Sequence, residues 1–308
     1  MADLDLTVAI TTFNRAALVG RAIESVLDQN RPALEVMVVD DASTDGTQEL
    51  VRSRYSNVRY IRRENNSGVC ASRNLALQTA SRPWVLFLDD DDTLVPNSLS
   101  RLAELVGVFP RARDYPVLEF ACSNGRSASP FMIATLADHL AGRVRGDFVP
   151  LIQRDYFLAE GLSYPQFRVP AESLLWLQVA SRFGIPTWTE TIIDVHSDAQ
   201  LRVTSANYQL LHARELAEIQ EYILSEWGEI LVAQFPAFYQ KKRLGAATYR
   251  LLANHRGLAR RHLRSVLSKR MSAWAFALWT LSLLPQACVR TCFEFYRQRG
   301  SGRSGGSH

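Results

Sequence analysis

The chain has 308 residues, of which 47% are hydrophobic and 21% are charged. This balance is typical of a folded globular protein with a full core, and it excludes a disordered, collagenous or coiled-coil protein. The formal net charge of +4 is unevenly spread, because acidic clusters lie in the first half whereas residues 241–270 are dense in Lys and Arg. Such a basic block favours an anionic surface as a partner.

The cysteines and the N-terminus indicate a reducing compartment. Cys70, Cys122, Cys288 and Cys292 are too few and too scattered for a disulfide framework, and no pair has the spacing of a zinc site. The N-terminus is acidic and leads directly into a short apolar run, without the basic region or cleavage site of a signal peptide. We therefore expect a cytosolic protein whose first apolar run is a strand.

From residue 6 to residue 110, short apolar runs alternate with segments of helical periodicity. Apolar runs start at residues 6, 34, 58 and 83, and helices are expected between them, at 46–54, at 68–80 and after Pro96. Strands separated by single helices predict an α/β fold with a mostly parallel sheet. In such sheets the ligand binds outside the carboxyl ends of the strands, so the polar residues there are the first candidates for a site.

The remainder of the chain divides into three further regions. Residues 111–204 contain short strands and loops with one helical pattern, and would build the other wall of the cleft. Residues 205–300 are helical in pattern throughout. Residues 301–308 are rich in Gly and Ser, and we expect a disordered tail.

Four successive aspartates, Asp89 to Asp92, follow the fourth apolar run. Adjacent like charges repel one another, and a divalent cation relieves that cost. Because alternate residues face the same side, Asp89 and Asp91 can present two oxygen ligands to Mg²⁺ or Mn²⁺ while Asp90 points elsewhere. The alternative is capping of the helix after Pro96, which Asp92 can perform but which needs only one acid.

A second acidic cluster follows the second apolar run. Thr44, Asp45 and Gly46 are typical of a turn and a helix N-cap. Asp40 and Asp41 lie before that turn, where a carboxylate can accept hydrogen bonds from a ribose hydroxyl or a base N–H. The sequence has neither a dinucleotide-binding fingerprint nor a P-loop, so a metal would have to hold any phosphates.

Four motifs in chain order carry a resemblance to a known family. They read TTFNR at 11–15, VVDDASTDGT at 38–47, NSGVCASRN at 66–74 and FLDDDD at 87–92. Together they resemble glycosyltransferase family 2 of the bacterial polysaccharide-biosynthesis type, over roughly residues 6–200. The resemblance implies inverting enzymes with a GT-A fold, in which residues 1–110 bind a nucleotide sugar and residues 111–204 bind the acceptor.

The resemblance also implies roles for individual residues. Those expected to bind the donor are Thr11, Phe13, Asp41, Arg73, Asp89, Asp90 and Arg202. Thr11 and Phe13 would frame the base, Asp41 would accept a hydrogen bond from it, and Arg73 would lie by the nucleotide or its phosphates. Asp91 would be the main metal ligand. A uridine diphosphate sugar is the donor that the family favours.

The catalytic base is expected in the less regular half. Direct displacement at an anomeric carbon needs one carboxylate that faces the acceptor hydroxyl. Family members often have an acidic pair just before a Leu-Trp-Leu helix, but here the pair is Ala171 and Glu172, which leaves Glu172 as the candidate base. The alternative is that Glu172 only stabilises the first turn of that helix.

A polar loop follows at 194–202 and resembles the family's mobile loop. His196 could ligate the metal as a neutral imidazole, although a lone His in such a loop is more often simply at the surface. The guanidinium of Arg202 suits phosphate.

Residues 271–284 are apolar for only about fourteen positions, whereas a membrane-spanning helix needs about twenty. Basic flanks, with Trp274 and Trp279 inside the segment, fit a helix that lies in the headgroup region of an anionic membrane. A buried helix is the alternative. We expect a cytoplasmic protein on the inner face of the cell membrane, and no nucleic acid partner, because the basic block lacks interleaved aromatic residues.

The sequence therefore predicts an inverting glycosyltransferase that moves a sugar from a nucleotide diphosphate to a hydroxyl of a glycan or a lipid-linked glycan. One alternative is a sugar nucleotidyltransferase, but such enzymes have a Gly-rich loop after the first strand, and residues 11–15 contain no glycine. Another is a catalytically silent nucleotide-sugar-binding or scaffold protein at the membrane, which Ala171 keeps open.

Overall fold

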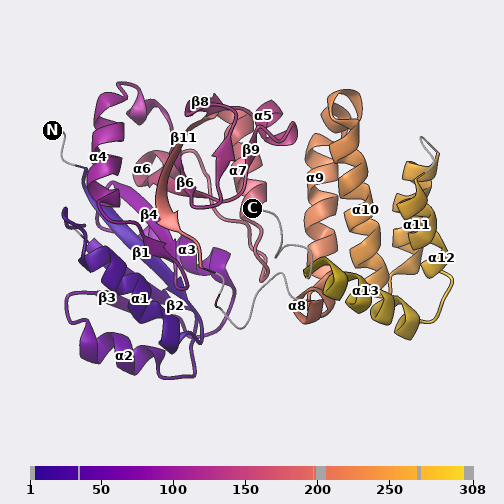
Figure 1. Cartoon of the computed structure of the whole chain (residues 1–308), viewed down its shortest axis with the longest axis horizontal. Coiled ribbons are helices and arrows are strands. Elements are labelled where there is room, and N and C mark those ends of the chain that lie inside the picture. Colours follow the sequence, from indigo (N-terminus) through magenta and orange to yellow (C-terminus); the bar gives the residue numbers. More distant parts are fainter. Residues whose placement is uncertain (1–3, 34, 197, 199–205, 269–271, 302–308) are drawn as a thin grey trace. The chain divides into compact units, whose positions relative to one another are not determined.

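A computed structural model of the chain describes residues 4–33, 35–196, 198, 206–268 and 272–301 (Figure 1). The chain divides into two compact units, residues 1–200 and residues 201–308. Of the tail expected at 301–308, residues 302–308 lie outside the described residues.

The first unit is built on a mixed sheet, in the strand order β3-β2-β1-β4-β10-β6-β11-β5. Four strands at one side are parallel: β1 (Leu6–Thr12), β2 (Glu35–Asp40), β3 (Arg59–Arg62) and β4 (Trp84–Asp89). The other strands are β5 (Thr93–Leu94), β6 (Val117–Cys122), β8 (Phe131–Ala134), β10 (Phe148–Gln153) and β11 (Ile185–Asp194). Strand β10 runs antiparallel to both β4 and β6. A separate pair consists of β7 (Arg126–Ser127) and β9 (Val144–Arg145). The expected α/β fold with a mostly parallel sheet is confirmed.

Helices connect these strands (Figure 1). They are α1 (Ala16–Leu27), α2 (Thr47–Arg54), α3 (Val69–Thr79), α4 (Ser98–Val108), α5 (Leu136–Leu140), α6 (Arg154–Ala159) and α7 (Glu172–Arg182), with a 3₁₀ turn at Ala112–Asp114. The helices expected at 46–54 and 68–80 correspond to α2 and α3. The expectation that Asp92 caps the next helix is wrong, because α4 begins at Ser98 with Asn97 as its N-cap residue.

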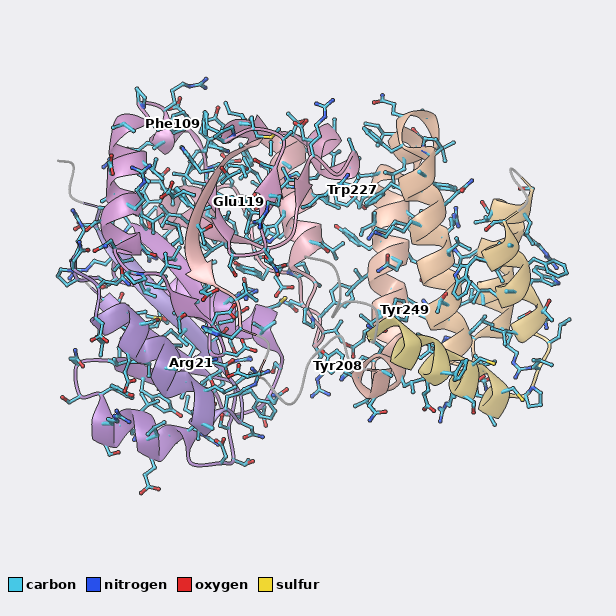
Figure 2. The ribbon with its side chains drawn as sticks, in the orientation of Figure 1. Arg21, Phe109, Glu119, Tyr208, Trp227 and Tyr249 are labelled. Carbon is cyan, nitrogen blue, oxygen red and sulfur yellow. The ribbon has the colours of Figure 1, made fainter. Side chains whose placement is uncertain are left out.

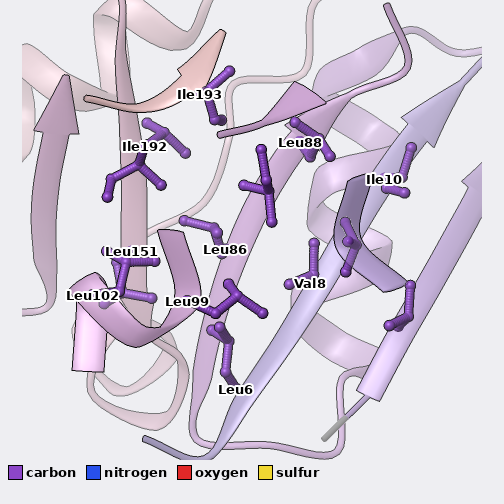
Figure 3. Packing of buried hydrophobic residues seen from close by; sticks show 14 of the residues in the cluster. Leu6, Val8, Ile10, Leu86, Leu88, Leu99, Leu102, Leu151, Ile192 and Ile193 are labelled. Atoms are coloured by element: carbon purple, nitrogen blue, oxygen red, sulfur yellow. The ribbon is translucent and has the colours of Figure 1, made fainter. Parts of the chain in front are cut away.

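The core of this unit fixes where the strands end. Every residue of β1 is buried, and β4 is buried up to Leu88. Figure 3 shows side chains of β1 and β4 gathered with those of α4, among them Leu99 and Leu102. Central strands that are covered on both faces read as continuous apolar runs, which is why the sequence located them closely.

The second unit consists of helices. They are α8 (Ala206–Leu211), α9 (Ala213–Gln234), α10 (Pro236–Leu252), α11 (Arg256–Leu267), α12 (Ala273–Leu281) and α13 (Gln286–Ser301). Helix α9 packs on α10, α10 on α11, and α11 on α12. A polar cluster ties three of them together: Glu221 of α9 accepts two hydrogen bonds from Arg250 of α10, at 2.9 and 2.6 Å, and lies 3.0 Å from Nε2 of His262 of α11.

The apolar segment at 271–284 forms α12 and the turn after it. Ala275 and Leu278 are buried in the core of the helical unit, whereas Phe276 is 64% exposed. None of the helices in the described part of the chain combines the length and the apolar composition that a bilayer crossing requires.

One carboxyl group is buried within the sheet of the first unit. Glu119 of β6 is 3% exposed, and the Thr187 hydroxyl lies 3.5 Å from it (Figure 2). Burial raises the pKa of Glu119 to about 7, and the weak hydrogen bond from Thr187 opposes this only in part.

Glu119 makes the stability of the fold depend on pH. The pKa of Glu119 is higher in the folded state than in the unfolded chain. Its contribution to the free energy of unfolding is therefore fully present below the unfolded pKa of 4.5 and is lost as the pH rises through about 7. We expect Glu119→Gln to unfold at a higher temperature than the wild type at about pH 8, but not at about pH 5. Thermal unfolding at both pH values checks this, with the half-exposed Glu190→Gln as the control. An equal difference in Tm at both pH values would contradict the prediction.

Candidate functional site

Hydrogen bonds hold together the polar segments at the carboxyl ends of β1, β2 and β4. The Asn14 N–H donates to the Ser43 hydroxyl (2.8 Å), and the Thr44 N–H donates to the Asn14 side-chain oxygen (2.7 Å). The Thr12 hydroxyl donates to a carboxylate oxygen of Asp90 (2.7 Å). The polar residues after three separate strands therefore form one cluster at the edge of the sheet where α/β folds bind ligands.

Asp90 is the member of the aspartate series that points into the protein. Its side chain is 10% exposed, and besides the bond from Thr12 it accepts a hydrogen bond from Arg15 at 3.3 Å. Burial raises the pKa of Asp90 to about 7, although the charge of Arg15 lowers it.

Asp92 joins the series to the polar loop after β11. Its carboxylate accepts a hydrogen bond from the His196 backbone N–H (3.0 Å), and Nε2 of His196 lies 2.9 Å from the Thr93 hydroxyl. Burial raises the pKa of Asp92 to about 7; the bond from His196 opposes this, and the charges of Asp89 and Asp91 add to it. His196 is thus placed beside the aspartates. Arg202, the other residue predicted in this loop, lies outside the described residues.

Asp89 and Asp91 are more accessible than Asp90, with side chains 48% and 24% exposed. Each accepts a hydrogen bond from an arginine at 2.7 Å, Asp89 from Arg73 and Asp91 from Arg15. No group of three His, Cys, Asp or Glu side chains that could hold a metal occurs in the described part of the chain. Mg²⁺, however, is usually bound by one or two carboxylates together with substrate phosphates. The two carboxylates fit that kind of site.

Arg73 of α3 connects Asp89 to Glu172. One guanidinium nitrogen donates to Glu172 at 2.5 Å and another donates to Asp89 at 2.7 Å. The guanidinium carbon lies 5.6 Å from the ring centre of Tyr164 and 5.8 Å from that of Phe87. Burial alone would lower the pKa of Arg73, but the charges of Asp89 and Glu172 raise it above its ordinary value. Arg73 therefore stays charged between two carboxylates from different parts of the unit.

Glu172 lies in the first turn of α7, as the sequence predicts, with Ala171 as the N-cap residue. Its side chain is 21% exposed, so it is reachable from solvent although Arg73 holds one of its oxygens. Ala171, at the position where family members often have the first acid, is buried. Glu172 is therefore a carboxylate at the start of α7 that solvent can reach, and its role as the base stays a prediction.

Asp41 holds the turn that leads into α3. Its carboxylate accepts hydrogen bonds from the N–H groups of Ser67 (3.1 Å) and Gly68 (2.7 Å) and from Arg63 (2.5 Å). Both oxygens are engaged, and the residue is 3% exposed. That Asp41 accepts a hydrogen bond from a nucleotide base stays a prediction.

Thr11 lies near the end of β1, and Phe13 directly follows that strand. Thr11 pairs with Asp89 of β4 in the sheet register and is buried, whereas Phe13 is 42% exposed. An exposed aromatic ring beside the polar strand ends offers a face for stacking. Their role in framing a base stays a prediction.

The sequence predicted no role for two arginines of the site. Arg15 contacts Asp90 and Asp91, as described above. Arg21 of α1, labelled in Figure 2, donates to the backbone carbonyl of Asp91 (2.5 Å) and to both carboxylate oxygens of Asp198 (2.8 and 3.1 Å). The sequence feature that could have identified them is their position: Arg15 directly follows the motif TTFN, and Arg21 comes six residues later on the helix. An excess of clustered negative charge calls for such positive partners.

The sequence of the first unit identifies its family. Residues 7–111 match the profile of Glycosyl transferase family 2. The chain has a domain of this family. It is 36% identical over 134 residues to the succinoglycan biosynthesis protein ExoO of Rhizobium meliloti, covering 43% of this chain and 38% of ExoO. It is also 37% identical over 103 residues to the GalNAc(5)-diNAcBac-PP-undecaprenol beta-1,3-glucosyltransferase of Campylobacter jejuni, covering 32% of this chain and 33% of that protein. The chain thus spans well under half the length of both relatives.

Solved structures share the fold of this chain. TarS of S. aureus, in complex with UDP-GlcNAc, has a TM-score of 0.56 and 19% identity, over 99% of this chain and 93% of that chain. The mannosyltransferase PcManGT of Pyrobaculum calidifontis, in complex with GDP-Man and Mn²⁺, has a TM-score of 0.52 and 17% identity, over 97% of this chain and 86% of that chain. The expected GT-A architecture with additional C-terminal helices is confirmed.

The turn before α3 sets the position of Arg73 and can be tested by substitution. Gly68 has φ +91°, and a Cβ added there would lie 2.5 Å from the backbone oxygen of Arg168. We expect Gly68→Ala to lower the free energy of unfolding by about 2 kcal/mol or more, because both the strain and the clash oppose the native turn. Gly107→Ala, in α4 with no atom within 4 Å of the added Cβ, is the control and should leave stability unchanged or slightly raised. Denaturant unfolding of both variants measures this; equal stabilities would contradict it.

Proposed function

We propose that this protein is an inverting, metal-dependent glycosyltransferase, which moves a sugar from a nucleotide diphosphate to a hydroxyl of a glycan or a lipid-linked glycan. The observation that carries the proposal is the bridge of Arg73 between Asp89 and Glu172 within a domain of glycosyltransferase family 2. The named relatives and the nucleotide-sugar complexes of proteins with the same fold support it.

In this proposal Glu172 is the base. A carboxylate oxygen of Glu172 takes the proton of the acceptor hydroxyl, and the acceptor oxygen forms a bond to the anomeric carbon of the donor. The bond between that carbon and the diphosphate oxygen breaks, so the configuration inverts and the diphosphate leaves with the electron pair. Arg73 orients Glu172 relative to Asp89, the residue on the donor side.

Asp91 and Asp89 would hold Mg²⁺ or Mn²⁺, with His196 of the loop after β11 bonded to the neighbouring Asp92. The cation would neutralise the charge that develops on the leaving diphosphate. Arg15 contacts Asp90 as well as Asp91, so its guanidinium keeps a carboxylate partner if Asp91 turns to a ligand.

A UDP-sugar is the proposed donor, with Thr11, Phe13 and Asp41 around the base and Arg202 at the phosphates. A lipid-linked acceptor is supported by the name of the Campylobacter jejuni relative, which specifies an undecaprenol-linked substrate for that protein. We place the enzyme in the cytoplasm, on the inner face of the cell membrane, where such an acceptor is presented.

The proposed base is tested by Glu172→Gln. We expect turnover with a UDP-sugar and a glycan acceptor to fall by about 10²–10⁴-fold, because the amide cannot take the proton, while binding of the donor is kept. Glu104→Gln, which removes a carboxylate that pairs with an arginine at 2.7 Å on the surface, is the control and should keep full activity. Turnover and calorimetric UDP binding together give the answer. Unchanged turnover would remove Glu172 from this role, and absence of turnover in the wild type with every donor would favour a scaffold protein.

The proposed metal site is tested by nucleotide binding. We expect UDP to bind in calorimetry with Mn²⁺ and about tenfold or more weakly after chelation, since the phosphates share the cation with the protein. Asp91→Asn should reproduce the loss in the presence of Mn²⁺. Asp114→Asn, at an exposed carboxylate that also pairs with an arginine at 2.8 Å, should bind like the wild type. Equal affinities with and without Mn²⁺ would argue against the metal.

A further inference from the structure

Helix α12 is apolar on every side but only half buried. Its sequence, AWAFALWTL, contains no charged residue. Ala275 and Leu278 face the core of the helical unit, whereas Trp274 is 43% and Phe276 is 64% exposed. A helix that is hydrophobic all round is normally covered on all sides. The outward side of α12 therefore has the composition of a buried surface.

The turn after α12 continues this exposed surface. Leu283 is 61% and Leu284 is 38% exposed, directly before Pro285. Trp274, Phe276, Leu283 and Leu284 are referred to below as the α12 surface. Contiguous apolar side chains on a protein surface mark sites that bind another protein or a membrane.

The charge around the α12 surface is entirely positive in sequence. No Asp or Glu occurs between Glu229 and Glu294, while that stretch contains 11 Lys and Arg residues. A surface that lacks acids over such a length favours an anionic partner.

Contacts bring two of these arginines, Arg260 and Arg264, next to α12. Arg261 and Arg264 of α11 lie about one turn apart and are both exposed. The Arg264 guanidinium lies 5.9 Å from the ring centre of Trp279 in α12. Arg260 donates to the hydroxyl and to the carbonyl of Ser282, both at 2.9 Å, and so fixes the end of α12 against α11.

Exposed apolar side chains next to exposed arginines fit one class of partner. A second copy docked face to face through this surface would bring the same positive charges together, which opposes self-association. A nucleic acid would not use the aliphatic Leu283 and Leu284, because stacking needs rings. An anionic bilayer satisfies both features at once, since headgroup phosphates take the arginines and the acyl boundary takes the apolar side chains.

We propose that the α12 surface inserts into the headgroup and acyl boundary of an anionic membrane, with Arg261 and Arg264 on lipid phosphates. Helix α12 then lies in the plane of the membrane. The inference deepens the proposed function. It rests on that function only for the reason why the protein binds a membrane, which is that the membrane presents a lipid-linked acceptor. Lipid binding is measured without glycosyl transfer, so either proposal can fail alone.

The test uses the full chain and sedimentation with vesicles. We expect binding to vesicles of phosphatidylcholine with about 30% phosphatidylglycerol, weaker binding to pure phosphatidylcholine, and loss of binding at high salt. The double variant Phe276→Ser, Leu283→Ser should bind at least about tenfold more weakly. Val108→Ser is the matched control, since Val108 is 71% exposed in the first unit, and should bind like the wild type.

Circular dichroism shows whether the apolar variant folds. If it does not fold, a charge variant provides an independent test. Arg261→Glu, Arg264→Glu should weaken binding to the anionic vesicles by about tenfold or more, whereas Arg113→Glu, at an exposed arginine of the first unit, should not. Wild-type protein that stays in the supernatant with anionic vesicles overturns the proposal. So does a dimer in light scattering that the apolar variant converts to a monomer, because the α12 surface would then contact a second copy.

Discussion

The position of one buried arginine determines how the site of the first unit is arranged. Arg73 belongs to α3, which connects β3 to β4 in the chain, and its two partners come from the end of β4 and from the start of α7. A buried guanidinium is stable only when carboxylates compensate for its lost hydration, and those carboxylates are unstable together without it. The donor side and the acceptor side of the proposed reaction are thus held by the same charge.

Much of this arrangement follows from the sequence, and the reason is periodicity. The apolar runs that became β1 and β4 are buried on both faces, so their ends are visible as the point where polar residues begin. Glu172 was located because a motif fixes its distance from the Leu-Trp-Leu segment of α7. The cluster at the strand ends was expected because parallel strands place their carboxyl ends at the same edge.

What the sequence did not give are pairings between distant residues. The insertion of β10 between β4 and β6, antiparallel to both, leaves no periodic signal, because strand order depends on how the whole unit packs. The arginines that pair with Asp89 and Asp91 belong to other segments, so charge alone does not identify which arginine pairs with which acid. The half-burial of α12 could not be predicted either, because an apolar stretch has the same sequence pattern whether one side or all sides of the helix are covered.

The close approach of Gly68 to the backbone of Arg168 has a mechanical consequence. Backbone atoms, unlike side chains, cannot rotate away from a contact, and the turn that carries Gly68 leads into α3 while residue 168 leads into α7. The two helices therefore start from one rigid junction. A displacement that keeps Arg73 bonded to Glu172 has to carry the starts of α3 and α7 together.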